Sequence, residues 1–222
     1  MNEPDIRGID SVQFSILSPN EIISRSVVDV TKQETYDKDE PVIKGLFDPR
    51  MGVTDMGKVC KTCGQKNIEC PGHFGHITLA RPVYNFHFMD YVIKTLNCVC
   101  FKCSKLLINK NNLFVSKLKQ KNPKNKFIDI YNESKKIGRC GQYTSDGCNC
   151  KQPDKYKFNG LDGIKATFKG LDPDDNNKIE EINVNIEYVK SLLERISDED
   201  VRHLGLSELY CRPEWLLCSV LP

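Results

Sequence analysis

The sequence predicts an α+β fold in which several helices and short antiparallel strands are joined by irregular segments. Three observations favour it. Apolar residues recur at helical spacing in several stretches, they alternate with polar residues in shorter ones, and 11 of the 222 residues are Cys, mostly in close groups. With 39% hydrophobic residues, the chain is long enough to bury a core.

The first quarter of the chain predicts a strand, a helix and turns. Apolar and polar residues alternate over residues 12–16, which indicates a half-buried strand. A capping box of Ser18 and Glu21 then begins a helix, and Pro19 suits its first position. The expected inner face of this helix comprises Ile22, Ile23 and Val27. The polar residues and the glycines and prolines of residues 32–57 predict loops and compact turns.

More helices and a terminal strand are predicted further along. Residues 86–96, 125–137 and 186–196 have apolar residues at helical spacing and should pack into a core. Ser197 can cap a short helix that follows. The apolar residues 215–222 indicate a strand. Because this run stops abruptly, we expect the native polypeptide to continue beyond it.

Charge and hydropathy exclude several classes of protein. The chain has 32 Lys and Arg against 30 Asp and Glu, so its total charge does not indicate a nucleic-acid-binding protein. It has no run of 18 apolar residues and no basic, apolar leader, so neither a membrane span nor a secretory signal is predicted. Residues 100–140 hold eleven basic residues against two acidic ones, which predicts a local basic face.

The first group of Cys residues predicts a structural metal site. In Cys60-x2-Cys63-x6-Cys70-x2-His73, two tight turns bring two ligands each to one ion. Three thiolates and an imidazole favour zinc over magnesium or calcium, and a closed set of four ligands leaves no position for a reactive water. His76 is the alternative to His73, but Cys-Pro-Gly-His forms the tighter turn and favours His73.

A second zinc site is predicted from the six Cys residues of residues 98–150. Its favoured ligands are Cys100, Cys103, Cys140 and Cys148. Cys98 is expected to be a buried thiol and Cys150 a nearby residue that does not bind the metal, although Cys150 stays open as the last ligand. Cys211 and Cys218 have no near partners in the sequence and are expected in the core.

Catalytic metal chemistry is not indicated. The His73-to-His76 segment lacks the Glu and the helical spacing of a zinc protease, and the zinc deaminase signature is absent from the sequence. The eight-ligand spacing of a RING-like adaptor is absent too. The residues therefore predict a structural zinc module, with a stand-alone zinc-dependent nucleic-acid-binding or adaptor module as the alternative.

Five ordered motifs span most of the chain. They are Gly45–Gly52, Cys70–Val83, Cys98–Leu107, Gly147-Cys148 with Gln152-Pro153, and Arg212–Trp215 with Val220–Pro222. Together they closely resemble the start of the largest subunit of multisubunit DNA-directed RNA polymerases, with the eukaryotic RNA polymerase II type the nearest.

The resemblance implies that residues 1–222 form the N-terminal clamp region, a mobile part that closes over template DNA and the RNA–DNA hybrid. It implies one zinc site within about residues 58–77 and another within about 98–150, with the same two sets of ligands as above. It also implies a helical part at about 184–206. Cys150 and the short segment 141–147 depart from the family pattern. The family's Asp triad, which holds Mg²⁺, has no counterpart here, so no catalytic residue and no activity of this segment alone are expected.

The resemblance also implies partners and a location. The partners are the second-largest and smaller polymerase subunits, template DNA and the RNA–DNA hybrid, without a membrane. The expected phosphate contacts on the basic face are Lys117, Lys119, Lys121, Lys124 and Lys126. The location is intracellular: the nucleus for a cellular source, or the host cell and virion for a large DNA virus, which the Asn- and Lys-rich composition favours.

Overall fold

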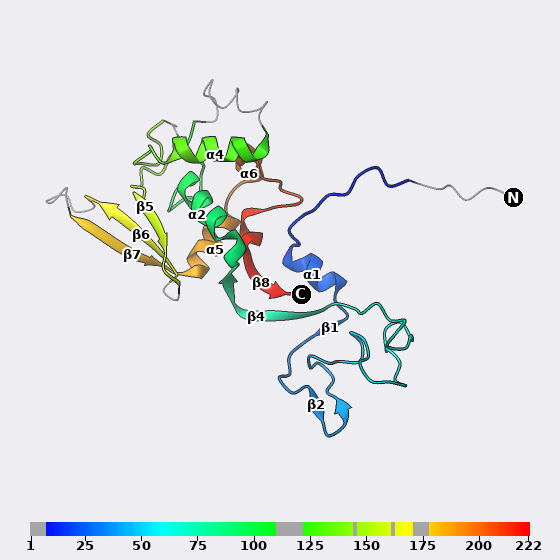
Figure 1. The fold of residues 1–222 in the computed structure, drawn as a ribbon. Coiled ribbons are helices and arrows are strands. Elements are labelled where there is room, and N and C mark those ends of the chain that lie inside the picture. Colours follow the sequence, from blue (N-terminus) through cyan, green and yellow to red (C-terminus); the bar gives the residue numbers. More distant parts are fainter. Residues whose placement is uncertain (1–7, 110–121, 144–145, 161–162, 171–177) are drawn as a thin grey trace.

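The computed structural model describes residues 8–109, 122–143, 146–160, 163–170 and 178–222, which form five α-helices and three small sheets (Figure 1). The helices are α1 (Pro19–Arg25), α2 (Met89–Cys98), α4 (Pro123–Ser134), α5 (Ile186–Glu194) and α6 (Asp198–Leu204). None of the described helices is long and apolar enough to cross a membrane. The α+β prediction is confirmed.

The longest strand, β4 (Gly75–Tyr84), joins the Cys60–His73 part of the chain to the helices (Figure 1). It pairs in parallel with β1 (Val28–Asp29) and antiparallel with the terminal strand β8 (Leu217–Leu221). β8 pairs with β4 over most of its length, so β4 lies between β1 and the C-terminal strand in one sheet.

Two further sheets are antiparallel. One is the small hairpin of β2 (Tyr36–Asp37) and β3 (Glu40–Pro41). The other is a three-stranded meander of β5 (Lys155–Phe158), β6 (Ile164–Lys169) and β7 (Ile179–Val184). Its alternate residues Ile164, Ala166 and Phe168 are buried against the helices.

The core lies among α2, α4, α5, α6 and the meander. Its most buried side chains include Val92, Leu96, Ile130, Leu192 and Leu193. They sit at the helical spacing that the sequence shows, so burial of one face explains why these segments are helices.

The predicted helix starts are confirmed by their caps. The Ser18 hydroxyl accepts a hydrogen bond from the Glu21 N–H at 3.2 Å, and the Glu21 carboxylate accepts one from the Ser18 N–H at 2.8 Å. The Ser197 hydroxyl caps α6 by accepting a hydrogen bond from the Asp200 N–H at 3.2 Å, and Gly205 ends the helix with a φ of 82°. The boundaries of the helix expected at 125–137 were wrong, because Asn122 caps α4 earlier and the helix ends at Ser134.

The strand expected at residues 12–16 was wrong. This segment is irregular, and Val12 and Phe14 are 73% and 94% exposed. Ile16 does reach other segments: its N–H donates to the Tyr210 carbonyl 3.0 Å away, and its partly buried side chain packs against the core. Among the described residues no strand pairs with it, so its apolar side chains have no sheet in which to be buried. Phe86, expected on the inner face of a helix, is also 80% exposed, in the 3₁₀ turn η1 (Phe86–Phe88) that precedes α2.

Candidate metal centres

The loop that precedes the first Cys turn is fixed by the buried carboxylate of Asp48. Its oxygens accept hydrogen bonds from the Lys44 N–H at 2.6 Å, the Arg50 N–H at 2.9 Å, and the Arg50 guanidinium at 2.9 and 2.7 Å. Hydrogen bonds from the Arg50 side chain are the main reason why the pKa of Asp48 lies well below its usual range. Burial alone would raise this pKa.

This loop is hydrogen-bonded to both Cys turns of the first group. The Lys61 N–H donates to the Pro49 carbonyl at 3.0 Å, and the Thr62 hydroxyl donates to the Arg50 carbonyl at 2.6 Å. On the other side, the His73 N–H donates to the Met51 carbonyl at 2.8 Å. The loop therefore sets the spacing between the two turns.

The Cys60 turn is closed by its own backbone. The Cys60 N–H donates to the Gln65 carbonyl at 2.9 Å, and the Gly64 N–H donates to the Cys60 carbonyl at 2.8 Å. Gly64 has a φ of 71°, which a residue without Cβ adopts at low cost. The Thr62 N–H points at Cys60 Sγ, 3.4 Å away, where it can stabilise a thiolate.

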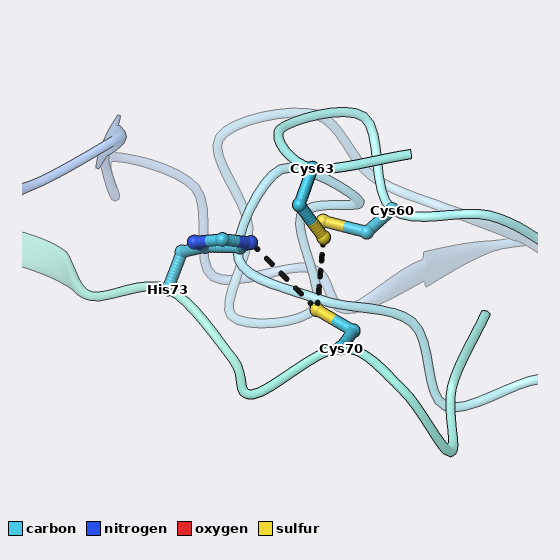
Figure 2. A group of neighbouring side chains, drawn as sticks. All are labelled: Cys60, Cys63, Cys70 and His73. Carbon is cyan, nitrogen blue, oxygen red and sulfur yellow. Dashed lines mark hydrogen bonds between the residues drawn. The ribbon is translucent and has the colours of Figure 1, made fainter. Parts of the chain in front are cut away.

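The four predicted residues of the first set converge on one point (Figure 2). The ligand atoms of Cys60, Cys63, Cys70 and His73 all lie within 4.8 Å of one another. Cys63 Sγ and Cys70 Sγ are 3.6 Å apart, and Cys70 Sγ and His73 Nε2 are 3.7 Å apart. A tetrahedral zinc with Zn–S bonds of about 2.3 Å has ligands about 3.8 Å apart, whereas a disulfide needs about 2.05 Å. The set fits a shared zinc ion.

His76, the alternative ligand, is placed elsewhere. Its Nδ1 lies 2.7 Å from the Ser26 hydroxyl, and its Nε2 lies 3.6 Å from an Asp29 carboxylate oxygen. His73 and not His76 belongs to the converging group.

The Cys100 turn repeats the geometry of the Cys60 turn. The Cys100 N–H donates to the Lys105 carbonyl at 2.8 Å, and the Ser104 N–H donates to the Cys100 carbonyl at 3.0 Å. The Lys102 N–H points at Cys100 Sγ, 3.4 Å away. Ser104, with a φ of 61°, has the same left-handed conformation as Gly64 in the first turn, where φ is 71°.

The other half of the second set is the segment from Cys140 to Cys150. The Cys140 N–H donates to the Cys150 carbonyl at 2.9 Å, and the Asn149 N–H donates to the Cys140 carbonyl at 3.0 Å. Gly141 and Gly147 approach so closely that a Cβ on Gly147 would collide with the Gly141 backbone. This approach folds the segment back and brings Cys148 beside Cys140.

The sulfur atoms of Cys100, Cys103, Cys140 and Cys148 lie within 4.8 Å of one another. Cys100 Sγ and Cys148 Sγ are 3.5 Å apart, and Cys103 Sγ and Cys140 Sγ are 3.7 Å apart. These separations again fit a tetrahedral zinc. The thiol of Cys150 lies outside the group of four and points at the Lys151 carbonyl.

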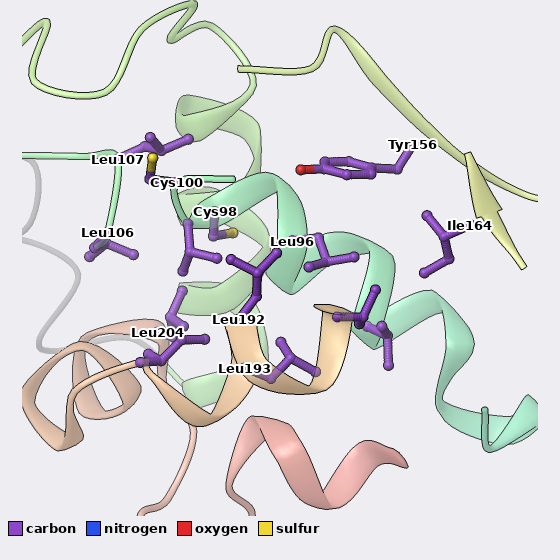
Figure 3. Packing of buried hydrophobic residues seen from close by; sticks show 14 of the residues in the cluster. Leu96, Cys98, Cys100, Leu106, Leu107, Tyr156, Ile164, Leu192, Leu193 and Leu204 are labelled. Carbon is purple, nitrogen blue, oxygen red and sulfur yellow. The ribbon is translucent and has the colours of Figure 1, made fainter. Parts of the chain in front are cut away.

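The other Cys residues lie apart from both sets. Cys98 is fully buried in the core, near Leu96 (Figure 3), and burial raises the pKa of its thiol to about 12. An un-ionised thiol in apolar surroundings is a poor ligand. Cys211 and Cys218 are partly buried rather than fully in the core.

One thiol in each set has a pKa close to neutral. Burial opposes ionisation of Cys60, but hydrogen bonds from the Cys63 and Thr62 backbones lower its pKa to about 6. For Cys148, burial is outweighed by the Cys150 backbone N–H and the neighbouring thiols, which lower its pKa to about 7. In each set these hydrogen bonds favour the thiolate, which is the form that binds metal.

The basic residues of 100–140 have several partners within the chain. Lys105 pairs with Asp146 at 3.0 Å and Lys136 with Glu133 at 2.6 Å. The Lys126 ammonium donates to the Arg202 carbonyl in the last turn of α6 at 2.8 Å, whereas Lys124 is exposed in the first turn of α4. Lys117, Lys119 and Lys121 lie outside the described residues.

The fold and the two groups of ligand residues define a loop-rich α+β module in which each group of four residues could hold a metal ion. The family model "RNA polymerase Rpb1, domain 1" matches residues 6–222, and the chain belongs to this family. It is also 39% identical over 226 residues to "DNA-directed RNA polymerase II subunit RPB1" of Euplotoides octocarinatus. The match covers 98% of this chain and 47% of that relative, so the chain spans about half its length. The resemblance to the N-terminal region of the largest subunit is thereby confirmed.

Proposed function

We propose that this chain is the N-terminal clamp portion of a DNA-directed RNA polymerase, a structural module with two zinc ions that helps to close over template DNA. The observation that carries the proposal is a family match over nearly the whole chain together with two sets of soft ligands at tetrahedral separations. The proposed clamp region is residues 1–222, with its helical part at about 184–206.

The first zinc would be held by Cys60, Cys63, Cys70 and His73. Among the described residues between 28 and 75, only Val28 and Cys60 are buried apolar residues. Packing alone therefore gives this part of the chain little stability. A structural zinc adds about 10 kcal/mol or more of binding free energy at neutral pH in peptide systems. That energy can fix two turns that have almost no core of their own.

The second zinc would be held by Cys100, Cys103, Cys140 and Cys148. It would join two segments that are separated in sequence by the whole of α4. The Tyr188 hydroxyl of α5 donates to the Phe101 carbonyl at 2.7 Å, and the rings of Phe101 and Phe168 contact edge to face. The metal, α5 and the meander would thus move as one body.

The way in which the two sites are joined to the rest of the chain supports the proposed clamp role. The first site continues directly into β4, which pairs with β8. Leu217 of β8 and Cys100 of the second site belong to the same buried core. A clamp built in this way can swing between open and closed positions without bending internally. No catalytic residue is proposed within residues 1–222. In the whole enzyme, a nucleotidyltransferase, Mg²⁺ would be bound outside this segment.

The proposed partners are the second-largest and smaller polymerase subunits, template DNA and the RNA–DNA hybrid, without a membrane. Lys117, Lys119, Lys121 and Lys124 remain proposed phosphate contacts, and Lys126 is the weakest of the proposed five because its ammonium already binds α6. The proposed location is the nucleus for a cellular source, or the host cell and virion for a large DNA virus.

The alternative is a stand-alone zinc-dependent nucleic-acid-binding or adaptor module. Affinity purification through a tag on this chain, in its source, separates the two. The clamp proposal predicts that the second-largest subunit co-purifies and that the material transcribes DNA. Recovery of the tagged chain without polymerase subunits, in a form that binds DNA tightly, would contradict the clamp and favour the alternative.

A further inference from the structure

The side-chain amide of Gln152 is buried beside the second Cys set with three hydrogen bonds. Gln152 is 6% exposed. Its Oε1 accepts from the Phe101 N–H at 2.8 Å, and its Nε2 donates to the Cys150 carbonyl at 2.8 Å and to Cys100 Sγ at 3.3 Å. Only an oxygen can face an N–H, and only an NH₂ can face a carbonyl and a thiolate, so the network fixes which way the amide points.

These hydrogen bonds join the two halves of the set. Phe101 lies inside the Cys100–Cys103 turn, and Cys150 is the last residue of the Cys140–Cys150 segment, which carries Cys148. The backbone of Gln152 is held as well, because its N–H donates to the Gly138 carbonyl at 2.9 Å. Gln152 therefore connects both ligand pairs from a fixed position.

Charge explains why the second set needs such a donor more than the first. Four thiolates around one Zn²⁺ leave two negative charges in excess, whereas three thiolates and a neutral imidazole leave one. The Thr62 N–H points at Cys60 Sγ and the Lys102 N–H at Cys100 Sγ, each at 3.4 Å, and the Cys63 backbone also donates to Cys60. Cys100 in addition accepts from the side-chain amide of Gln152 at 3.3 Å. An N–H that points at a thiolate stabilises its charged, metal-binding form.

We propose that Gln152 is a positioning residue for the second metal site: its amide donates to the Cys100 thiolate and holds the Cys100–Cys103 turn against the segment that carries Cys148. This inference rests on the second zinc of the proposed function. Outer residues that orient metal ligands typically change metal affinity by about 10- to 100-fold when they are replaced.

Two replacements separate packing from hydrogen bonding. Gln152→Met keeps the length and much of the volume of the side chain but removes all three hydrogen bonds. Gln152→Glu is nearly isosteric and turns a carboxylate oxygen towards the Cys150 carbonyl and the Cys100 thiolate. The matched control is Gln65→Met, an exposed residue at the end of the Cys60 turn.

The measurement is zinc release from the 222-residue chain to excess 4-(2-pyridylazo)resorcinol, with the second site identified by its loss in Cys148→Ser. We expect Gln152→Met to speed release from the second site by about tenfold, Gln152→Glu to speed it further, and the first site to be unchanged. Gln65→Met should change neither. Second-site release within about twofold of wild type in both Gln152 variants, or equal loss from both sites, would overturn the inference.

Cobalt supplies a readout that packing alone would not move. In the Co²⁺-loaded chain, loss of the hydrogen bond raises the energy of the Cys100 sulfur electrons, so Gln152→Met should shift the sulfur-to-cobalt charge-transfer band to lower energy while the tetrahedral d–d bands persist. An unshifted band would overturn the inference. A wild-type chain with no second zinc would overturn the proposed site itself, whereas two zinc ions with unaltered variants would overturn only the role of Gln152.

Discussion

Ser104 occupies the same left-handed position in the Cys100 turn that Gly64 occupies in the Cys60 turn, with φ values of 61° and 71°. Both residues donate their N–H to the carbonyl of the first Cys of the turn. The backbone of a Cys-x2-Cys turn therefore determines this conformation, and the side chain has to tolerate it.

Replacing Ser104 by Gly should stabilise the protein. A residue with a Cβ in this conformation costs about 1–2 kcal/mol, and the buried Ser104 hydroxyl finds no partner among the described residues. The extra freedom of Gly in the unfolded chain offsets about 0.5–1 kcal/mol of this, so we expect a net gain in stability of about 1 kcal/mol.

Gly64→Ser is the matched test and should cost about 1 kcal/mol of stability, because a Cβ there meets open space and adds only backbone strain. Thermal unfolding of the zinc-loaded variants measures both. A lower melting temperature for Ser104→Gly would contradict this account.

Asp48→Asn should destabilise the loop that holds the first site. The substitution removes a carboxylate that accepts four hydrogen bonds, and because the Arg50 side chain is partly exposed and screened, we expect a loss of about 2 kcal/mol at pH 7. The pKa of Asp48 is lower in the folded state than in the unfolded state. The ionised carboxylate therefore adds stability that is fully present above the unfolded pKa of about 3.9 and is lost as the pH falls through the pKa of the folded state.

Urea unfolding of wild type and Asp48→Asn across pH checks this dependence. The difference between their free energies of unfolding should stay constant from about pH 8 to 5 and shrink only below about pH 4. A difference that changes across the neutral range would mean that another group titrates with the loop.

Lys124 and Lys126 should behave differently although they are two residues apart. Lys124 is exposed, so Lys124→Ala should lower the salt slope of DNA binding by about 1 without changing stability. The Lys126 ammonium donates to the Arg202 carbonyl at the end of α6, so Lys126→Ala should cost about 1 kcal/mol of stability instead. Fluorescence anisotropy over a salt series and urea unfolding separate the two effects. An unchanged salt slope for Lys124→Ala would remove it from the DNA contacts.

Local signals in the sequence were enough to place most helices and the Cys sets. Capping by Ser18 and Ser197 depends on residues three positions away, and a Cys-x2-Cys turn depends on its own backbone. Such features need no knowledge of the rest of the chain, which is why the sequence predicts them.

Strands depended on pairing, which the sequence does not show. Alternation over residues 12–16 predicted a strand that the structure lacks, whereas the same alternation at Ile164, Ala166 and Phe168 went unused and marks a real one. The difference is that β6 has a partner on each side and residues 12–16 have none among the described residues. The position of Cys148 similarly depends on the contact between Gly141 and Gly147, which spacing alone does not reveal.

The roles of Asp48 and Gln152 had no signal of their own. A polar residue that is buried and fully hydrogen-bonded looks the same in a sequence as one on the surface, because burial is a property of the fold. Their place within the motifs that resemble the polymerase family was the only indication, and it did not say what they do.

The central claim is most directly tested by counting zinc ions in the chain by native mass spectrometry, after purification without chelator. The account predicts two zinc ions per chain, one in Cys148→Ser and still two in Cys150→Ser, because the Cys150 thiol lies outside the converging set. A wild-type chain without zinc and with intramolecular disulfides, or loss of zinc from Cys150→Ser but not from Cys148→Ser, would contradict it.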